Sequence, residues 1–246
     1  KTWEATMDAV TKTLQRHDES NCNRILICGA KGCGKSTMLR YATNRILSEQ
    51  IMKGSGSTDV AVLDLDCGQP ELSVPGLITL TIVSQPLFSD PPLHMVHGVD
   101  TIAVDTDEKH KSKQSLHHEA AYFFGDITSK ADPDKYVEMA TLLMHKYNNL
   151  KKDRIKQGKE HLPLLINTDG WVKGFGYEIL CAVIEASNPG NIIQMVGTTK
   201  TKSFDLPSQS TIPSASNQRF IHTVQSFDET GLVIPEDDNR SRRSMD

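Results

Sequence analysis

The sequence lacks the features that mark several whole classes of protein. No apolar run among its 246 residues approaches the roughly 20 residues that span a membrane, and the N-terminal segment has no apolar signal region. The five cysteines form no Cys-x-x-Cys pair and show no metal-ligand spacing. We therefore expect an intracellular protein with reduced cysteines and no membrane partner.

Neither sign of charge dominates the chain. It has 27 Lys and Arg residues against 31 Asp and Glu residues, which gives a formal net charge of −4. This balance disfavours a protein coated with positive charge for nucleic acid, but it leaves room for one local basic groove. Of the two basic clusters, residues 151–156 are interpreted as the solvated end of a helix, and residues 240–243 lie near the last residue.

One motif is present without a mismatch. Residues 29–37 fit G-x-x-x-x-G-K-[ST] and lie between an apolar strand-like run and a helix-like segment. The glycines let successive backbone N–H groups converge on phosphate oxygens, and the helix N-terminus adds unpaired donors. Lys35 can reach the β- and γ-phosphates, and the Ser36 hydroxyl can bind Mg²⁺. The predicted triphosphate-binding residues are Gly29, Ala30, Lys31, Gly32, Cys33, Gly34, Lys35, Ser36 and Thr37.

Apolar runs and helical periodicities alternate along the chain. The strand-like segments are residues 24–28, 60–66, 77–83, 120–125, 163–168, 191–196 and 219–224. The helix-like segments are residues 1–20, 36–50, 133–147 and 175–188. This alternation predicts an α/β fold, a P-loop NTPase with a mostly parallel β-sheet and helices on both faces. Ligands of such sheets bind beyond the carboxyl ends of the strands.

A second group of polar residues closes the strand-like segment 60–66. Strand alternation predicts that Asp64 and Asp66 lie on the same side, and Gln69 follows just past a glycine. One carboxylate could orient Mg²⁺ or its water shell while the other accepts a proton from an attacking hydroxyl. The alternative is an ordinary Walker B strand, whose acids both serve the metal of a plain NTPase.

Five segments occur in a fixed order, and together they resemble one family. They are the phosphate loop and residues 64–69, 73–76, 125–129 and 167–171. The set resembles the eukaryotic polynucleotide 5′-hydroxyl kinases, and within them the nucleolar branch that processes pre-rRNA. The resemblance implies a nuclear, nucleolar enzyme that uses ATP and Mg²⁺ to phosphorylate RNA with a 5′-hydroxyl end. It also implies a HEPN-type endoribonuclease as partner.

The resemblance implies a role for each matching residue. Lys35 and Ser36 correspond to the phosphate-loop lysine and the Mg²⁺-binding hydroxyl. Asp66 corresponds to the general base for the RNA 5′-hydroxyl, and Asp64 would assist Mg²⁺ as a catalytic and metal-binding residue. An aromatic side chain suits the RNA end, because base stacking contributes about 1–3 kcal/mol with any sequence. The implied RNA-binding residues are Gln69, Thr128, Thr168 and Trp171.

The family also has an arginine-bearing lid. Arg240, Arg242 and Arg243 fall where this lid is expected, so that Arg240 and Arg243 are implied catalytic residues that stabilise the transferring phosphoryl group. Because the chain ends three residues after Arg243, we expect the lid, residues 236–246, to be truncated.

The expected domain organisation is simple. Residues 1–20 form an N-terminal helix or the remnant of a preceding domain, and residues 21–246 form the P-loop polynucleotide kinase domain. Residues 85–118 have no clear periodicity and are expected to form a long loop or insertion. Its histidines, which we interpret as solvated because no metal-ligand spacing is present, are His94, His97, His110, His117 and His118.

Two other functions stay open. The chain could be an ATP-binding structural subunit that scaffolds an RNA-processing nuclease without turnover. It could also be a switch-type NTPase that hydrolyses its nucleotide to drive assembly. The retained base position and RNA-binding residues favour the kinase.

Overall fold

The computed structural model describes residues 2–14, 21–54, 59–88, 116–159, 162–197, 204–206 and 219–226. Within these ranges no helix combines the length and the apolar character needed to cross a membrane.

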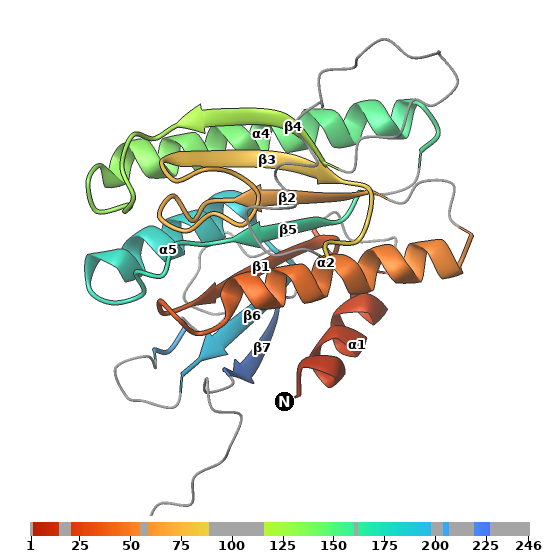
Figure 1. The fold of residues 1–246 in the computed structure, drawn as a ribbon, viewed down its shortest axis with the longest axis horizontal. Helices are drawn as coiled ribbons and strands as arrows, with labels where there is room; N and C mark the ends of the chain where they lie inside the picture. The colour runs from red at the N-terminus through yellow and green to blue at the C-terminus, as the bar shows by residue number, and fades with distance from the viewer. Residues whose placement is uncertain are drawn as a thin grey trace, which may run out of the picture.

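Seven strands form one sheet in the order β4-β3-β2-β5-β1-β6-β7 (Figure 1). Their bounds are β1 (Arg24–Gly29), β2 (Val60–Asp64), β3 (Leu77–Val83), β4 (Leu116–Phe123), β5 (Leu164–Asn167), β6 (Asn191–Val196) and β7 (Phe220–Gln225). The direction of β3 is opposite to that of the other strands, so its pairings with β2 and β4 are antiparallel and the other described pairings are parallel. The central strands β2 and β5 are buried at every position, which explains why they are continuous apolar runs.

The described helices cover both faces of the sheet. They are α1 (Trp3–Leu14), α2 (Lys35–Met52), α4 (Pro133–Lys156) and α5 (Phe175–Ser187). Figure 1 shows α1 and α2 in front of the sheet and α4 and α5 behind it, and each pair packs together. The predicted α/β fold, with a mostly parallel sheet between two layers of helices, is confirmed.

Local sequence signals explain where α4 begins and ends. The Asp132 carboxylate accepts a hydrogen bond from the Lys135 backbone N–H at 3.0 Å, and Pro133 occupies the first turn, where its missing N–H costs nothing. The helix continues to Lys156, so the basic segment 151–156 forms its last turns, as predicted, but Arg154 is not solvated, because it forms an ion pair with Asp59 at 2.9 Å. Basic side chains there interact favourably with the negative end of the helix dipole.

At the N-terminus, α1 packs into the same body as the sheet. Met7 and Val10 are fully buried, and α1 contacts α2 and β7. The expected division at residue 20 falls outside the described residues and stays a prediction.

Several boundaries differ from the sequence prediction, among them the start of β4 and the end of β2. β4 begins at Leu116 rather than at Ala120, so the expected loop 85–118 ends inside a strand that contains His117 and His118. Polar side chains are tolerated there because β4 is an edge strand with only one fully buried residue, so an apolar run does not mark it. Likewise β2 ends at Asp64, two residues before Asp66.

Of the five histidines of segment 85–118, two are described. The His118 Nδ1 lies 2.8 Å from the Thr81 hydroxyl of β3, which is a hydrogen bond within the sheet. His94, His97 and His110 lie outside the described residues. Within the described ranges no group of three or more His, Cys, Asp and Glu side chains could hold a metal ion.

The sheet brings three strand ends together at one edge. Asn167 at the end of β5 pairs in register with Ile27 of β1 and with Asp64 of β2. Because these strands are parallel, the segments that follow them leave the sheet side by side, and all three carry predicted site residues.

Candidate active site

The phosphate loop connects β1 to α2. Gly34, the N-cap of α2, has φ 85°, a left-handed conformation that side chains other than glycine adopt at a cost. Its carbonyl accepts a hydrogen bond from Met38 N–H at 2.9 Å, which starts the helix. Lys35 and Ser36 therefore lie in the first turn, where backbone N–H groups have no helical acceptor and anions bind.

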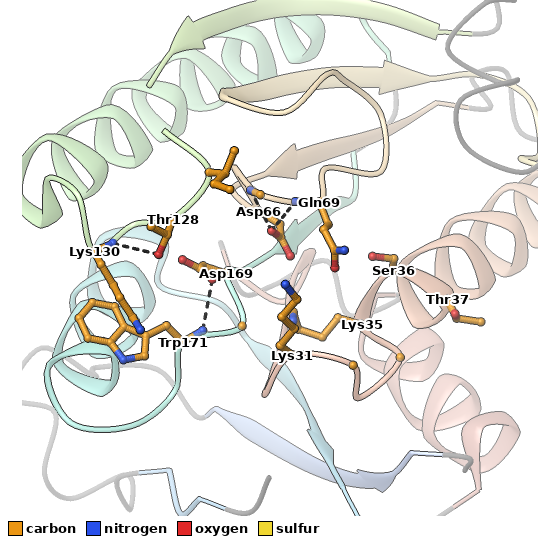
Figure 2. Close-up of a pocket in the computed structure, with 15 residues that line it drawn as sticks. Lys31, Lys35, Ser36, Thr37, Asp66, Gln69, Thr128, Lys130, Asp169 and Trp171 are labelled. Carbon is orange, nitrogen blue, oxygen red and sulfur yellow. Dashed lines mark hydrogen bonds between the residues drawn. The ribbon is translucent and has the colours of Figure 1, made fainter. Parts of the chain in front are cut away.

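A cavity of about 650 Å³ lies beyond the strand ends (Figure 2). Four segments line it: the phosphate loop, the segments after β2 and β5, and the connection from β4 to α4. The lining residues are Lys31, Gly32, Gly34, Lys35, Ser36, Thr37, Asp66, Gly68, Gln69, Ile127, Thr128, Lys130, Asp169, Gly170 and Trp171. The volume is within the range of small-molecule sites.

Most predicted site residues meet in this cavity, and some do not. Of the predicted nucleotide-binding residues, Gly29, Ala30 and Cys33 are not among the lining residues. Asp64 and Thr168 are also absent from the lining. The predicted lid arginines Arg240 and Arg243 lie outside the described residues.

Lys35 is the clearest electrostatic feature of the cavity. The residue is only 6% exposed, yet it lines the cavity. Among the described side chains, no carboxylate forms an ion pair with its ammonium group. A nearly buried cation without a counterion is unfavourable, so the site fits an anionic ligand such as a phosphate chain. The adjacent Ser36 hydroxyl supplies an oxygen of the kind that Mg²⁺ prefers.

Asp66 presents a carboxylate to the same cavity. Its Oδ1 accepts hydrogen bonds from the backbone N–H groups of Gly68, at 3.2 Å, and Gln69, at 3.0 Å. This turn fixes the carboxylate at the cavity wall, across from the phosphate loop, with Gln69 beside it (Figure 2).

Asp64 has a different environment from the one that alternation predicts. It is fully buried, and its Oδ2 accepts backbone N–H groups of Glu71, at 2.6 Å, and Leu72, at 3.4 Å. Its Oδ1 accepts the Asn167 amide at 2.9 Å and the Asp66 N–H at 3.3 Å. Burial raises the pKa of the Asp64 carboxyl to about 6, and the hydrogen bonds from Asn167 and Glu71 oppose this shift.

These contacts assign Asp64 to the loop rather than to the ligand. Both of its oxygens hold N–H donors, and it does not line the cavity, so the expected metal-binding and catalytic role does not fit its position. The reason is that β2 ends at Asp64; the chain then turns, and Asp66 leaves the strand pattern on which the prediction was based.

Thr168 also faces the protein interior. It is 2% exposed, and its hydroxyl donates to the Ile27 carbonyl at 3.0 Å, which joins β5 to β1. The predicted RNA contact therefore does not fit the Thr168 side chain, whereas Trp171, three residues later, lines the cavity.

Asp169 is a cavity residue that the sequence prediction missed. Its Oδ2 accepts hydrogen bonds from the backbone N–H and the hydroxyl of Ser129, and its Oδ1 accepts the Trp171 N–H at 3.2 Å. It thereby joins the segment after β5 to the connection between β4 and α4. The available signal was a carboxylate two residues past a buried strand, the same position that Asp66 occupies after β2.

Close backbone approach joins the segment after β5 to the phosphate loop as well. A Cβ added to Gly170 would lie 2.9 Å from the Lys31 nitrogen and 3.0 Å from the Lys31 Cα. Only glycine fits this contact without moving one of the two segments. The walls of the cavity are thus coupled through backbone packing.

Known proteins resemble this chain in sequence and in fold. Residues 29–226 match the family model described as mRNA cleavage and polyadenylation factor CLP1 P-loop. The polynucleotide 5′-hydroxyl-kinase NOL9 of Arabidopsis thaliana is 34% identical over 170 residues, which cover 69% of this chain and 39% of that protein. The polynucleotide 5′-hydroxyl-kinase grc3 of Schizosaccharomyces pombe is 32% identical over 172 residues, 70% of this chain and 20% of that protein. The matched part of the chain therefore spans less than half the length of these relatives.

A solved structure has the same fold. The structure of wild-type Clp1p in complex with Pcf11p superposes with a TM-score of 0.63 and 16% identity, over 95% of this chain and 50% of that chain. The resemblance to the polynucleotide 5′-hydroxyl kinases that the motifs predicted is confirmed by the named relatives. Together with the match over residues 29–226, these findings show that the chain belongs to the P-loop family of the mRNA cleavage and polyadenylation factor CLP1, which includes the polynucleotide 5′-hydroxyl kinases.

Proposed function

We propose that this chain is the P-loop domain of a kinase that transfers the γ-phosphoryl group of ATP to the 5′-hydroxyl of RNA. The observation that carries the proposal is the meeting of Lys35 and Asp66 in one cavity (Figure 2). A phosphate-binding lysine and a carboxylate that can accept a proton are the two groups that phosphoryl transfer to a hydroxyl needs. The relatives named polynucleotide 5′-hydroxyl kinases support the same reaction.

In the proposed reaction each side chain has a separate task. The phosphate loop and Lys35 hold the triphosphate, and Asp66 takes the proton from the RNA 5′-hydroxyl. The hydroxyl oxygen then forms a bond to the γ-phosphorus, while the bond to the β,γ-bridging oxygen breaks and ADP leaves. Because phosphoryl transfer needs no covalent enzyme intermediate, positioning and electrostatic stabilisation supply most of the rate.

Mg²⁺ would bind the Ser36 hydroxyl and phosphate oxygens, and it would neutralise charge on the transferring group. Ser36 lines the cavity beside Lys35, which supports this assignment. Asp64 is not part of it, because its oxygens are held by backbone and amide donors. Arg240 and Arg243 are proposed to contribute cationic donors from a lid.

The RNA end would lie on the wall formed by Gln69, Thr128 and Trp171, which all line the cavity. By resemblance to the nucleolar branch, we propose pre-rRNA spacer processing as the biological role, with a HEPN-type endoribonuclease as partner and the nucleolus as location. The structural relative in complex with Pcf11p shows that a protein of this fold assembles with another protein.

The test is transfer of label from γ-labelled ATP to a 5′-hydroxyl RNA oligonucleotide, on the protein purified with any partner that accompanies it. We expect labelled RNA, and loss of label in Lys35→Ala and in Asp66→Asn. A 5′-phosphorylated oligonucleotide of the same sequence is the control and should stay unlabelled.

Two results would overturn the proposal. Tight ATP binding without label on any RNA end would identify a scaffolding subunit. Release of phosphate to water at a rate that RNA does not change would identify a switch-type NTPase.

A further inference from the structure

Lys130 lies over the ring of Trp171. Its Nζ is 4.8 Å from the ring centroid, and both residues line the cavity (Figure 2). This geometry is a cation–π contact, which contributes about 0.5–1 kcal/mol at an exposed site. Lys130 is exposed, so the contact is weak enough for a ligand to displace.

Two neighbouring residues of α5 also pack against the Trp171 ring. A Cβ added to Gly176 would lie 2.4 Å from Cγ and Cδ2 of the indole, so the Gly176 backbone packs directly against the ring. Phe175 meets the ring edge to face, with centroids 6.2 Å apart. A base that stacks on the face of Trp171 under Lys130 takes the place that the Lys130 ammonium occupies.

The Lys130 ammonium has no carboxylate partner among the residues that the structure describes. The neighbouring carboxylate of Asp169 is held by Ser129 and by the Trp171 N–H. Figure 2 also shows Lys130 beside Trp171 and away from Ser36 and Thr37, whereas Lys35 serves the nucleotide side. An unpaired cation on the acceptor side of the cavity is suited to a phosphate of the nucleic acid rather than of the nucleotide.

We propose that Lys130 is a positioning residue for the RNA end and covers the stacking face of Trp171 until RNA binds. A terminal base stacks on Trp171 with about 1–3 kcal/mol and displaces the ammonium. The released ammonium pairs with a phosphodiester of the same strand, so one side chain exchanges an aromatic partner for a phosphate. This inference rests on the proposed function, because it assigns a further contact to the same acceptor.

The test is the salt dependence of RNA binding. We would measure the Kd of a fluorescent 5′-hydroxyl RNA by anisotropy over a range of salt concentrations. The proteins are the wild type, Lys130→Ala, Lys130→Arg and a control, Lys146→Ala, which removes an exposed lysine from the middle of α4. One lost phosphate contact on a single strand lowers the slope of log Kd against log salt by about 0.7.

We expect this lower slope in Lys130→Ala, the wild-type slope in Lys130→Arg, and no change in Lys146→Ala. In steady-state kinetics Lys130→Ala should raise KM for RNA and leave KM for ATP and kcat unchanged. An unchanged slope in Lys130→Ala would overturn the inference even if the enzyme transfers phosphate normally. Failure of the wild type to bind RNA at all would instead overturn the proposed function, and this inference with it.

Discussion

The backbone N–H of Asp66 donates a hydrogen bond to Oδ1 of Asp64 at 3.3 Å. The two carboxylates are therefore neighbours with different tasks. Asp64 is buried and holds the turn that follows β2, whereas Asp66 faces the cavity. Substitution of Asp64 should therefore change the stability of the fold, and substitution of Asp66 should change the rate of phosphoryl transfer.

Asp66→Asn should lower kcat by about 10²- to 10⁴-fold, the usual contribution of a general base, and leave ATP affinity unchanged. The amide preserves the side-chain shape and an oxygen that can accept the Gly68 and Gln69 N–H groups. Single-turnover labelling of RNA measures the rate, and ATP titration measures the affinity. Equal rates in variant and wild type would exclude Asp66 as the base.

Asp64 should make the free energy of unfolding depend on pH. Its folded-state pKa of about 6 lies above the ordinary value of 3.8. Between these two pH values the folded protein therefore retains a proton that the unfolded chain has released. The stabilising contribution is complete below about pH 4 and is lost as pH rises to about 6; the loss is of the order of 3 kcal/mol. Urea unfolding of the wild type and Asp64→Asn should therefore show a difference in stability that changes over this interval. Parallel pH profiles would contradict the prediction.

Asp169→Ala should weaken RNA binding without weakening ATP binding. The substitution removes the acceptor for Ser129 and for the Trp171 N–H. The segment after β5, which carries Trp171, then loses its hydrogen bonds to the segment that carries Thr128. The unsatisfied donors should also lower stability by about 1–3 kcal/mol. Ser129→Ala removes one donor only and should have a smaller effect. A double-mutant cycle with both variants measures the coupling, and additive effects would show that the contact does not couple the segments.

Gly170→Ala should lower ATP affinity, because the added Cβ would lie 2.9 Å from the Lys31 nitrogen and displace the phosphate loop. Gly158→Ala is the control. It is strained by its φ of 70° but meets nothing within 4 Å, so it should cost about 1 kcal/mol of stability and leave ATP affinity unchanged. Isothermal titration with ATP compares the two, and equal affinities would contradict the packing argument.

One thiol should react first in the native protein. Cys22, Cys28, Cys33 and Cys67 are at most 2% exposed, whereas Cys181 is partly exposed. Burial also raises the pKa of Cys28 and Cys67 to about 12, which keeps these thiols protonated and unreactive. A thiol reagent should modify a single thiol under native conditions, and Cys181→Ser should abolish that modification. Rapid modification of several thiols would show that the core opens.

Much of the fold was predictable because the central strands are buried on both faces. Such strands are rich in apolar residues, and β2, β3, β5 and β6 were located within a few residues. The predicted start of β4 was four residues too late, because an edge strand needs no apolar run. The register of β4 with β3 also depends on pairing with residues that are distant in sequence. The reversed direction of β3 likewise follows from pairing, which leaves no local trace.

The amino-acid sequence by itself determined the phosphate loop, because all its donors come from one contiguous segment whose conformation glycine and the helix N-terminus set locally. It also determined the identity of the carboxylate, glutamine and tryptophan that follow the neighbouring strands. Only the tertiary structure decided which of these side chains reach the cavity. Asp64 and Thr168 point to donors and acceptors on other strands, while Asp169 and Lys130 meet partners from other segments. The physical reason is that burial and hydrogen bonding depend on what the folded chain brings alongside, and strand alternation does not continue past the last paired residue.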